Sequence, residues 1–430
     1  MDKVFLGVAG FGTVGTGLAK ILADNGDWIE RRLGKRIAIK KVLVRDLNKT
    51  RAANAGEEAT FTTRSTDLTD DPDIAIVVEL MGGIDAAKGL IEDALRAGKH
   101  VVTANKHLLA KHGPELFALA AERGAGLFYE ASVAGGIPSI VTFKESLAGD
   151  RVTDILGILN GTANYILSEM SDTKKKLDFQ EALRQATELG YAEADPTMDI
   201  EGHDTAHKLT VLIRLAFGVD YPLDELPVTG ITGVTPEDIA YAREFGYRVK
   251  LIAEARDVDG RIEAGVFPAF VKHTYLLARV GGNYNAIRVT GNAVGPVMLH
   301  GQGAGDLPTG SAVLADIMAL VRSCGAPDNT GFRNEPLEKA RILPPAETQG
   351  RHYLRCRVAD RPGVMAAIAQ CMADHSMSIA QAVQKGEPDH GVVDVVFLTH
   401  EACGESLAGA IEQINAMDFL QGPLVHYRIL

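Results

Sequence analysis

The feature that most constrains the fold is a glycine-rich turn at residues 10–15, which reads GFGTVG. It directly follows an apolar run, residues 4–9, and opens a segment of helical character. In such a turn Gly10 permits the tight bend, Gly12 lets the backbone approach a pyrophosphate, and Gly15 lets helix and strand pack closely. The unpaired N–H groups at the helix start then face the phosphates. We therefore predict a dinucleotide-binding site formed by Gly10, Gly12, Thr13, Val14 and Gly15.

The segments after this turn alternate between strands and helices. Apolar strands are predicted at residues 38–44 and 74–80, a helix at 86–97, and a further strand in GKHVVTANK, residues 98–106. This alternation is typical of a parallel sheet with helices on both faces, so residues 1–137 are predicted to form a Rossmann-type, doubly wound α/β domain. Ligands of such sheets bind at the carboxyl ends of the strands.

The pattern changes after about residue 138. Amphipathic helices mix with strands, and residues 250–297 are rich in strand-forming segments. We predict an α+β substrate and dimerisation domain over residues 138–305, with an open sheet available to pair with a second subunit. A helix within residues 306–327 then returns to the nucleotide domain, and residues 328–349, rich in Pro, Asn, Glu and Arg, are predicted to be a linker.

The last segment, residues 350–430, has its own order of elements. A strand, a helix, two strands, a helix and a strand follow one another, which is the ferredoxin-like βαββαβ pattern. The first strand leads through the turn DRPG, residues 360–363, into a helix whose first backbone N–H groups are free to bind a ligand. An ordinary strand-to-helix turn explains the same residues.

Composition excludes several classes of protein. The net charge of -12 argues against binding to a nucleic-acid backbone, which requires Lys and Arg. No apolar run reaches the roughly 20 residues of a membrane helix, and the first residues do not resemble a signal peptide. The four cysteines show no CxxC spacing and are predicted to be reduced thiols of a cytoplasmic protein.

The choice between the two nicotinamide cofactors depends on the end of the second strand. Arg45 and Asp46 lie there, and Arg51 is near. An acid accepts a hydrogen bond from the 2′-hydroxyl of NAD, whereas an arginine pairs with the 2′-phosphate of NADP. Because Arg45 comes first, NADP is favoured and NAD remains possible; a solvated pair of charges is the alternative to both.

The candidate catalytic residues lie in the segment GYAEADPTMDIEGHDTAHKLTVL, residues 190–212. Asp204 and Lys208 are four residues apart, so they share one face of a helix. The alternative is an ordinary surface ion pair. The helix continues as LTVLIRLAF, however, and such an apolar stretch indicates burial, so its first turn is expected to face a cleft. Glu193 and Asp199 lie in the preceding loop.

Four motifs together resemble the homoserine dehydrogenase family. They are GFGTVG, TANK at residues 103–106, NGTANYIL at residues 160–167, and YAEADP followed by DIEGHDTAHK. They occur in order over residues 3–320 with the spacing typical of the family. The resemblance implies reduction of L-aspartate 4-semialdehyde to L-homoserine, a step of threonine, methionine and isoleucine biosynthesis, with hydride passing to or from the nicotinamide.

The resemblance also implies roles for individual residues. Lys208 would exchange the proton on the reacting oxygen, which requires its pKa to be lowered towards the working pH. Lys106, expected at the end of its strand, would be a second cation between cofactor and substrate. The substrate's α-ammonium group needs acids, and the candidates are Glu193, Asp204 and Asp199. Thr162 is a candidate hydroxyl contact.

Further sites are implied by the resemblance alone. The segment EASVAGGIP, residues 130–138, matches a region where family members bind a monovalent cation such as sodium through backbone carbonyls, here Val133, Gly135 and Ile137, with Glu130 nearby. Gly190, Gly303 and Gly305 would line the cofactor from its far side. Residues 350–430 resemble an ACT domain, for which threonine is the expected effector. Assembly into a homodimer or homotetramer is expected.

Other functions would require other features of the sequence. A semialdehyde dehydrogenase requires a nucleophilic cysteine, and residues 1–323 contain none. A bifunctional kinase–dehydrogenase would need a long catalytic region before the nucleotide fold. Another amino-acid-linked NAD(P) dehydrogenase, or a cofactor-binding ACT protein that has lost catalysis, remains open. The presence of Lys106, Glu193, Asp204 and Lys208 together disfavours the last of these.

Overall fold

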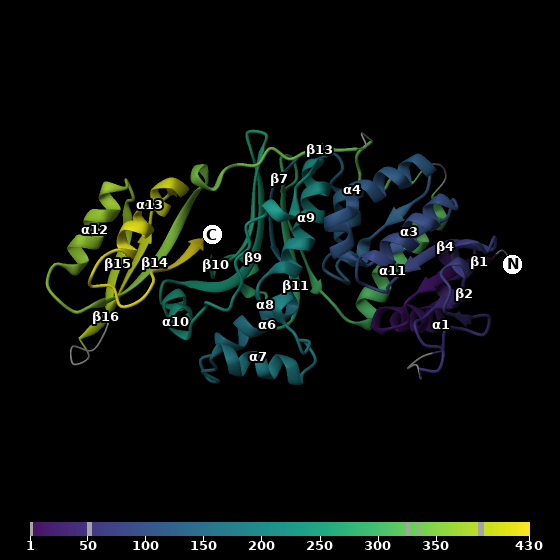
Figure 1. Ribbon diagram of the computed structural model, residues 1–430, viewed down its shortest axis with the longest axis horizontal. Coiled ribbons are helices and arrows are strands. Elements are labelled where there is room, and N and C mark those ends of the chain that lie inside the picture. The colour runs from purple at the N-terminus through teal and green to yellow at the C-terminus, as the bar shows by residue number, and fades with distance from the viewer. Residues whose placement is uncertain (1–2, 50–53, 324–326, 334–335, 386–390) are drawn as a thin grey trace.

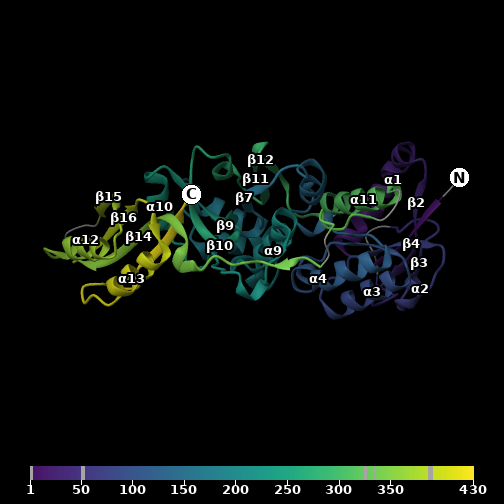
Figure 2. The same cartoon turned by 90° about the horizontal axis from the view of Figure 1, so that it is seen from above.

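The computed structural model describes residues 3–49, 54–323, 327–333, 336–385 and 391–430. It forms an elongated molecule of three parts in a row (Figures 1 and 2). The nucleotide-binding part, with the N-terminus, lies at one end, a sheet-rich part occupies the centre, and a small terminal module lies at the other end. Functional sites between the first two parts are therefore far from the terminal module in space.

The first part is a six-stranded parallel sheet in the order β3-β2-β1-β4-β5-β6. Alternate residues of its strands face opposite layers: Leu6 and Val8 pack with helices α1 and α11, whereas Ala9 and Val77 pack with α3 and α4. The predicted Rossmann-type fold is confirmed. The elements are β1 (Lys3–Ala9), α1 (Thr13–Leu33), β2 (Arg36–Leu43), β3 (Thr60–Thr62), α2 (Thr66–Thr69), β4 (Ile74–Glu79), α3 (Asp85–Arg96), β5 (His100–Thr103), α4 (Lys106–Arg123) and β6 (Leu127–Phe128).

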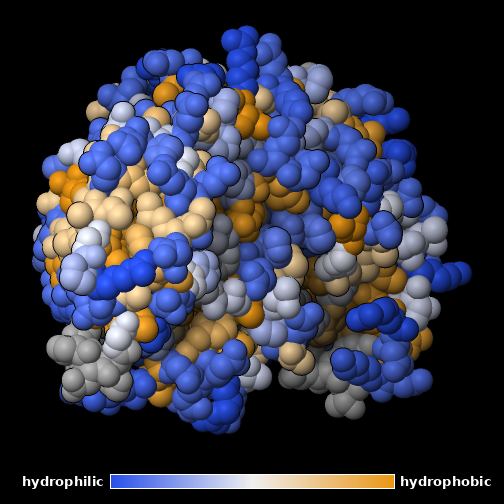
Figure 3. All heavy atoms as spheres, turned by 60° about the vertical axis from the view of Figure 1, so that its left-hand side comes forward, coloured by the Kyte–Doolittle hydropathy of each residue, from blue (hydrophilic) through white to orange (hydrophobic). Residues whose placement is uncertain are grey.

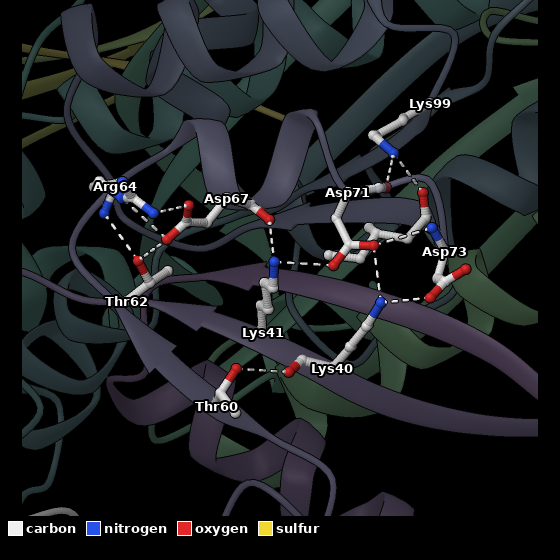
Figure 4. Close-up of polar contacts among 10 residues, drawn as sticks. Lys40, Lys41, Thr60, Thr62, Arg64, Asp67, Asp71, Asp73 and Lys99 are labelled. Carbon is white, nitrogen blue, oxygen red and sulfur yellow. Dashed lines mark hydrogen bonds and ion pairs between the residues drawn. The ribbon is translucent and has the colours of Figure 1, made fainter.

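A cluster of ion pairs fastens the loop between α2 and β4 to strand β2 (Figure 4). The pairing of β2 with β1 shifts by one residue at Lys40. Lys40 and Lys41 both bind the carboxylate of Asp71, at 2.8 and 2.9 Å, and Lys40 also binds Asp73. Lys99 donates to the backbone oxygen of Asp71 at 2.6 Å. This edge of the sheet is thus held by charged side chains as well as by its core.

The central part is an antiparallel sheet in the order β12-β11-β7-β9-β10, against which α6 and α9 pack. Its elements are β7 (Val152–Ile158), α6 (Gly161–Met170), α7 (Phe179–Glu188), α8 (Thr197–Ile200), α9 (His203–Phe217), β8 (Val219–Asp220), α10 (Pro236–Glu244), β9 (Tyr247–Val258), β10 (Arg261–Lys272), β11 (Tyr284–Gly291) and β12 (Gly295–Gln302). The short helix α5 (Ser139–Val141) leads into it.

The terminal module has the predicted βαββαβ order, with its strands arranged β18-β14-β16-β15. Its last strand does more than complete the module, because β18 also pairs in parallel with β10 of the central part, at Ala269 and Phe270. One edge of the central sheet is therefore covered by the same chain, which the sequence did not lead us to expect. The elements are β14 (Gln349–Ala359), α12 (Val364–Asp374), β15 (Ile379–Lys385), β16 (Val392–Thr399), β17 (Ala402–Cys403), α13 (Gly404–Asn415) and β18 (Val425–Ile429).

A buried ion pair strengthens this junction. Asp238 of α10 is fully buried, and Arg355 of β14 binds its two carboxylate oxygens at 2.7 and 3.0 Å. The hydroxyl of Tyr353 donates to the same carboxylate at 2.9 Å. Paired donors of this kind compensate a buried carboxylate for the water it has lost. The module is thus joined to the centre by a shared sheet and by charge.

Two connections lead from the centre to the ends. Helix α11 (Asp306–Arg322) returns to the first part, where Gly17 of α1 and Gly310 of α11 allow the two helices to approach closely, since a side chain at either would collide with the other helix. The segment 328–349, predicted as a plain linker, also contains a short strand, β13 (Glu338–Lys339), which pairs with β8. The linker is therefore attached to the centre at this strand.

None of the helices in the described ranges is both long and apolar enough to cross a membrane. The view that brings the terminal module forward shows hydrophilic residues over much of the surface, interrupted by apolar areas (Figure 3).

Candidate active site

The glycine-rich turn has the geometry that a dinucleotide requires. Gly10 has φ +95°, and a Cβ there would lie 2.5 Å from the carbonyl oxygen of Leu80; a Cβ at Gly15 would lie 2.7 Å from the oxygen of Gly10. Gly12, by contrast, has no heavy atom within 4 Å of where its Cβ would be. The turn is therefore tight on the protein side and open at Gly12, where Thr13 and Val14 begin α1. Pyrophosphate fits this opening.

The residues expected to read the ribose lie close to the turn but are solvent-exposed. Strand β2 ends at Leu43, and Arg45 and Asp46 follow it on the surface. The Asp46 carboxylate accepts a hydrogen bond from the backbone of Asn48 at 2.8 Å. Arg51 lies outside the described residues. The arrangement leaves Arg45 free to turn towards a 2′-phosphate.

The centre of the site is an aspartate between two lysines. Asp204 lies in the first turn of α9, after Gly202, whose φ of +85° reverses the chain. Its Oδ2 accepts from the Nζ of Lys208 at 2.6 Å, and its Oδ1 lies 2.9 Å from the Nζ of Lys106. Lys208 also donates to the backbone oxygen of Leu159 at 2.7 Å. The structure thus brings together the three residues to which the sequence analysis assigned catalysis.

We had expected Lys106 at the end of its strand, and this expectation is wrong. Strand β5 ends at Thr103, and Lys106 is the first residue of α4. The reason is Asn105, whose side-chain oxygen accepts a hydrogen bond from the backbone N–H of Leu108 at 3.1 Å and so caps the helix. Helix α4 packs against α9 of the central part, so Lys106 at its start reaches Asp204.

The three groups differ in their tendency to hold a proton. Burial lowers the pKa of Lys208, and Lys106 adds to this effect, whereas Asp204 opposes it. The pKa of Lys106 is raised, chiefly by Asp204. Burial works to raise the pKa of Asp204, but Lys208 and Lys106 hold it well below its usual range. The site therefore combines a carboxylate whose charged form is favoured, one lysine whose protonated form is favoured, and one lysine whose neutral form is favoured by burial.

Asn160, which the sequence analysis did not single out, joins two of the acids. Its Nδ2 donates to Asp199 Oδ1 at 2.6 Å and to Asp204 Oδ2 at 2.9 Å. Thr162 lies two residues further on; its hydroxyl donates to the backbone oxygen of Tyr191 at 2.7 Å and also lies within hydrogen-bonding reach of Asp199, whose pKa it helps to lower. Only the motif NGT pointed to this segment, and nothing in it identified the bridging amide.

Glu193 and Gly190 lie in the loop before α8. The side chain of Glu193 is exposed, and its charge contributes to raising the pKa of Lys106, so the two groups are close enough to interact. Gly190 has φ +75° and open space where a side chain would be. The loop thus places a carboxylate beside Lys106 without fixing it there.

Two histidines next to the lysines connect the two parts of the site. The rings of His107 in α4 and His207 in α9 stack with centroids 4.3 Å apart and planes at 9°. Burial lowers the pKa of both, that of His207 to about 4, so both rings are neutral near neutral pH. Their contact fixes the relative position of the helices that carry Lys106 and Lys208.

The residues expected to bind a cation form a compact turn. Glu130 accepts hydrogen bonds from the backbone of Ile140 and Val141 at 2.8 Å, and its own N–H donates to Asp316. Val133 O accepts from the Ser139 hydroxyl and Ile137 O from its N–H, at 3.1 and 2.7 Å. A carbonyl oxygen has a second lone pair, so these contacts still allow a cation.

Gly303 and Gly305, the glycines expected on the far side of the cofactor, lie next to the predicted cation-binding turn. Gly135 has φ +53°, and a side chain there would collide with the backbone of Gly303. Gly305, with φ +128°, precedes the first residue of α11. The loop of Gly303 and Gly305 therefore packs on the predicted cation-binding turn. Within the described ranges, no group of three or more His, Cys, Asp or Glu side chains is arranged to bind a metal ion.

Comparisons with known proteins match each part of the chain to a family. The family model of homoserine dehydrogenase matches residues 138–318, that of the homoserine dehydrogenase NAD-binding domain matches residues 10–130, and that of the ACT domain matches residues 352–419. The homoserine dehydrogenase of Neisseria gonorrhoeae is 41% identical over 434 residues, covering 100% of this chain and 99% of the relative. That of Bacillus subtilis is 38% identical over 432 residues, with the same coverage.

Solved structures of homoserine dehydrogenases are also similar to this chain. A homoserine dehydrogenase from Thiobacillus denitrificans superposes with a TM-score of 0.93 at 42% identity, covering 100% of this chain and 99% of the other. A hyperthermophilic archaeal homoserine dehydrogenase in complex with NADPH gives a TM-score of 0.63 at 28% identity over 76% of this chain and 100% of the other. With the nucleotide cradle, the Lys106–Asp204–Lys208 cluster and the full-length match in agreement, this chain belongs to the homoserine dehydrogenase family.

Proposed function

We propose that the chain interconverts L-homoserine and L-aspartate 4-semialdehyde as an NAD(P)-dependent oxidoreductase. The observation that carries the proposal is the cluster in which Asp204 binds Lys208 at 2.6 Å and Lys106 at 2.9 Å, at the junction of the nucleotide-binding and central parts. The direct test is homoserine-dependent formation of NAD(P)H, followed at 340 nm. A protein that binds the cofactor but shows no such formation would be the non-catalytic alternative.

In this proposal Lys208 exchanges the proton of the reacting oxygen. When homoserine is oxidised, its hydroxyl proton passes to the neutral amine of Lys208 while the hydride leaves the adjoining carbon; reduction reverses both transfers. The bound nicotinamide supplies the acceptor and donor of that hydride. Burial of Lys208, which lowers its pKa, supports this role. Lys106 stays protonated and stabilises negative charge on the oxygen.

The substrate's α-ammonium group would be bound by acids around this cluster. Asp199 and Asp204 lie on one side of it, joined by Asn160, and the exposed Glu193 lies on the loop beside Lys106. Thr162 offers its hydroxyl oxygen as an acceptor. Three carboxylates against two lysines leave net negative charge for an ammonium ion.

NADP is the proposed cofactor in preference to NAD. Support comes from Arg45, exposed just after β2, and from the archaeal relative that was solved with NADPH. The ratio of kcat/KM for the two cofactors tests this. Arg45→Glu is expected to shift the ratio towards NAD by about tenfold, which is the effect of losing one charged contact of about 1.4 kcal/mol. A parent enzyme that prefers NAD would refute the proposal.

A monovalent cation such as sodium would be bound by the carbonyl groups of Val133, Gly135 and Ile137, with Glu130 nearby. The close packing of this turn against Gly303 gives the cation a structural role, which is to fix the loop beside the cofactor. Replacing sodium and potassium by a bulky organic cation should then lower both activity and thermal stability. If neither changes, the cation is not part of the enzyme.

The ACT module is proposed to bind threonine and inhibit the enzyme. Its DRPG turn ends at Gly363, with φ +93°, where α12 begins; the N–H of Val364 donates to the oxygen of Arg361 at 3.5 Å, and the following N–H groups of the first turn would be offered to the ligand. Activity measured with and without millimolar threonine tests this; no effect would leave assembly as the role of the module. A homodimer or homotetramer and a cytoplasmic location stay predictions, to be measured by sedimentation and by cell fractionation.

A further inference from the structure

We propose that Asn160 is a positioning residue of this site, whose side-chain amide binds Asp199 and Asp204 simultaneously and holds both carboxylates towards the substrate. The proposal rests on the proposed function and extends it to a residue outside the Lys–Asp–Lys cluster. It concerns a neutral side chain that contacts the two acids and would act through them.

The geometry of the amide uses both ends of the group. Its Nδ2 carries two hydrogens, one for Asp199 at 2.6 Å and one for Asp204 at 2.9 Å. Its Oδ1 accepts from the backbone N–H of Ala163 at 2.8 Å and thereby caps α6. A rotated amide would place its oxygen against two carboxylates and its N–H groups against an N–H donor. The orientation is therefore fixed from both sides, and Asn160 is only 5% exposed.

The two carboxylates need such a donor because they repel each other. Burial raises the pKa of Asp199, the hydrogen bond from Asn160 lowers it, and the charge of Asp204 raises it again. The charged groups that face Asp199 are Asp204 and Lys208 on α9 and Lys106 on α4. Asn160 thus favours the ionised form of Asp199, which an ammonium substrate requires, without adding a charge.

A neutral donor also protects the chemistry of Lys208. A third cation in place of Asn160 would keep Asp199 ionised, but it would compete with Lys208 for Asp204 and further lower the pKa of the lysine. An apolar residue would remove one hydrogen bond from each acid, and because Asp204 keeps its two lysines, the protonated form of Asp199 would be favoured. An amide avoids both effects, which explains why this residue type suits the position.

Asn160 both caps α6 and bridges the two aspartates, and mutations can separate these two roles. Ser and Asp are both good helix caps, so Asn160→Ser and Asn160→Asp keep the bond to the Ala163 N–H, whereas neither supplies two N–H donors. The matched control is Asp178, which caps α7 by accepting from Glu181 N at 2.9 Å and lies exposed, away from the site. Asp178→Ser measures the cost of changing a cap alone.

The experiment is the pH dependence of kcat/KM for homoserine in the full-length enzyme, expressed as the ratio of variant to parent. For Asn160→Ser we expect a loss of about tenfold or more, greatest at low pH, because Asp199 now ionises at higher pH; the ratio should rise with pH. For Asn160→Asp the ratio should fall with pH, because the added carboxyl donates to one of the two acids only while it is protonated and repels both once it ionises. The Kd for NADPH should not change.

A purely structural role predicts something different, namely ratios that do not vary with pH and match that of Asp178→Ser. That result would overturn the proposal. A parent enzyme that forms no NAD(P)H from homoserine would instead refute the proposed function. The two failures stay distinct because the carboxyl of Asp199 can be titrated by carbon-13 NMR without turnover. Its pKa should rise in Asn160→Ser, and an unchanged value would refute the positioning role.

Discussion

Two aspartates in this molecule are each held between two lysines. Asp71 lies in the loop before β4 of the nucleotide-binding sheet (Figure 4), and Asp204 lies in the proposed active site. Each receives its two ammonium groups at between 2.6 and 2.9 Å, and each side chain is 8% exposed. Counted as salt bridges, the two clusters are nearly identical.

The difference lies in the lysines. Lys40 is 27% exposed, and its hydrogen bonds to Asp71 and Asp73 raise its pKa. Lys208 is only 10% exposed, and burial lowers its pKa even though Asp204 binds it. The protonated form of the first lysine is favoured by its partners, whereas burial favours the neutral form of the second. The comparison teaches that the depth of the lysine, rather than its pairing with an aspartate, decides the direction in which its pKa shifts.

The largest difference between the two clusters is expected when a lysine of each is replaced. Lys208→Met is expected to lower kcat by about 1000-fold, within the usual contribution of a general acid–base group, while the Kd for NADPH changes little. Lys40→Met should leave kcat within about twofold. Steady-state assays at 340 nm and fluorescence titration of NADPH measure these values. A Lys208→Met enzyme with more than about a tenth of the parent rate would mean that another group moves the proton.

Replacing the aspartates should give the next largest difference. Asp204→Asn is expected to lower kcat/KM by about 100-fold. Because Asp204 raises the pKa of Lys208, its loss should also shift the rise of homoserine oxidation with pH to lower pH. Asp71→Asn should lower Tm by a few degrees and leave the pH profile unchanged. An unshifted profile for Asp204→Asn would show that Lys208 does not set it.

A smaller effect is expected from the flexible acid of the site. Glu193→Gln should raise KM for homoserine by about tenfold with little change in kcat, because it removes one charge from ammonium binding and none from proton transfer. Asp195→Asn is the control, since Asp195 lies exposed in the same loop and accepts from Thr197. Equal values of KM in both variants would exclude Glu193 from substrate binding.

The smallest effect should appear in the surface cluster. Lys40→Ala is expected to lower Tm by about a degree at low ionic strength, and the difference from the parent should shrink in 1 M salt, which screens exposed charges over about 3 Å. Calorimetry at two salt concentrations measures this. A difference that does not depend on salt would show that Lys40 acts through its packing on Phe5 rather than through charge.

Much of this site could be predicted because its signals are local. Asp204 and Lys208 are four residues apart on one helix, and Gly10, Gly12 and Gly15 lie in a single turn. Asn160 could not be found in this way, because its two acceptors lie 39 and 44 residues away and an amide in a motif does not reveal what it binds. The same applies to His107 and His207, whose stacking exists only after two helices from different parts of the molecule have packed.

In the fold, too, the features with local sequence signals could be predicted, and those formed between distant segments could not. The parallel sheet and the βαββαβ module follow from alternating elements that are adjacent in sequence. The pairing of β18 with β10 does not, because either strand edge accepts any partner strand, and only the tertiary arrangement selects which one is used. The end of strand β5 was placed too late for a smaller reason, since Asn105 caps a helix in a segment whose apolar residues continue the pattern of a strand.

The strand shared between the terminal module and the central sheet bears on how the enzyme can be engineered. Deleting residues 350–430 to test whether the module controls activity would uncover the backbone of β10 at Ala269 and Phe270 and remove Arg355 from Asp238. Bare strand edges promote aggregation, and an orphaned buried carboxylate destabilises the remaining chain. Point substitutions at the DRPG turn, which leave β14 and β18 in place, are therefore the better way to test whether the module binds an effector.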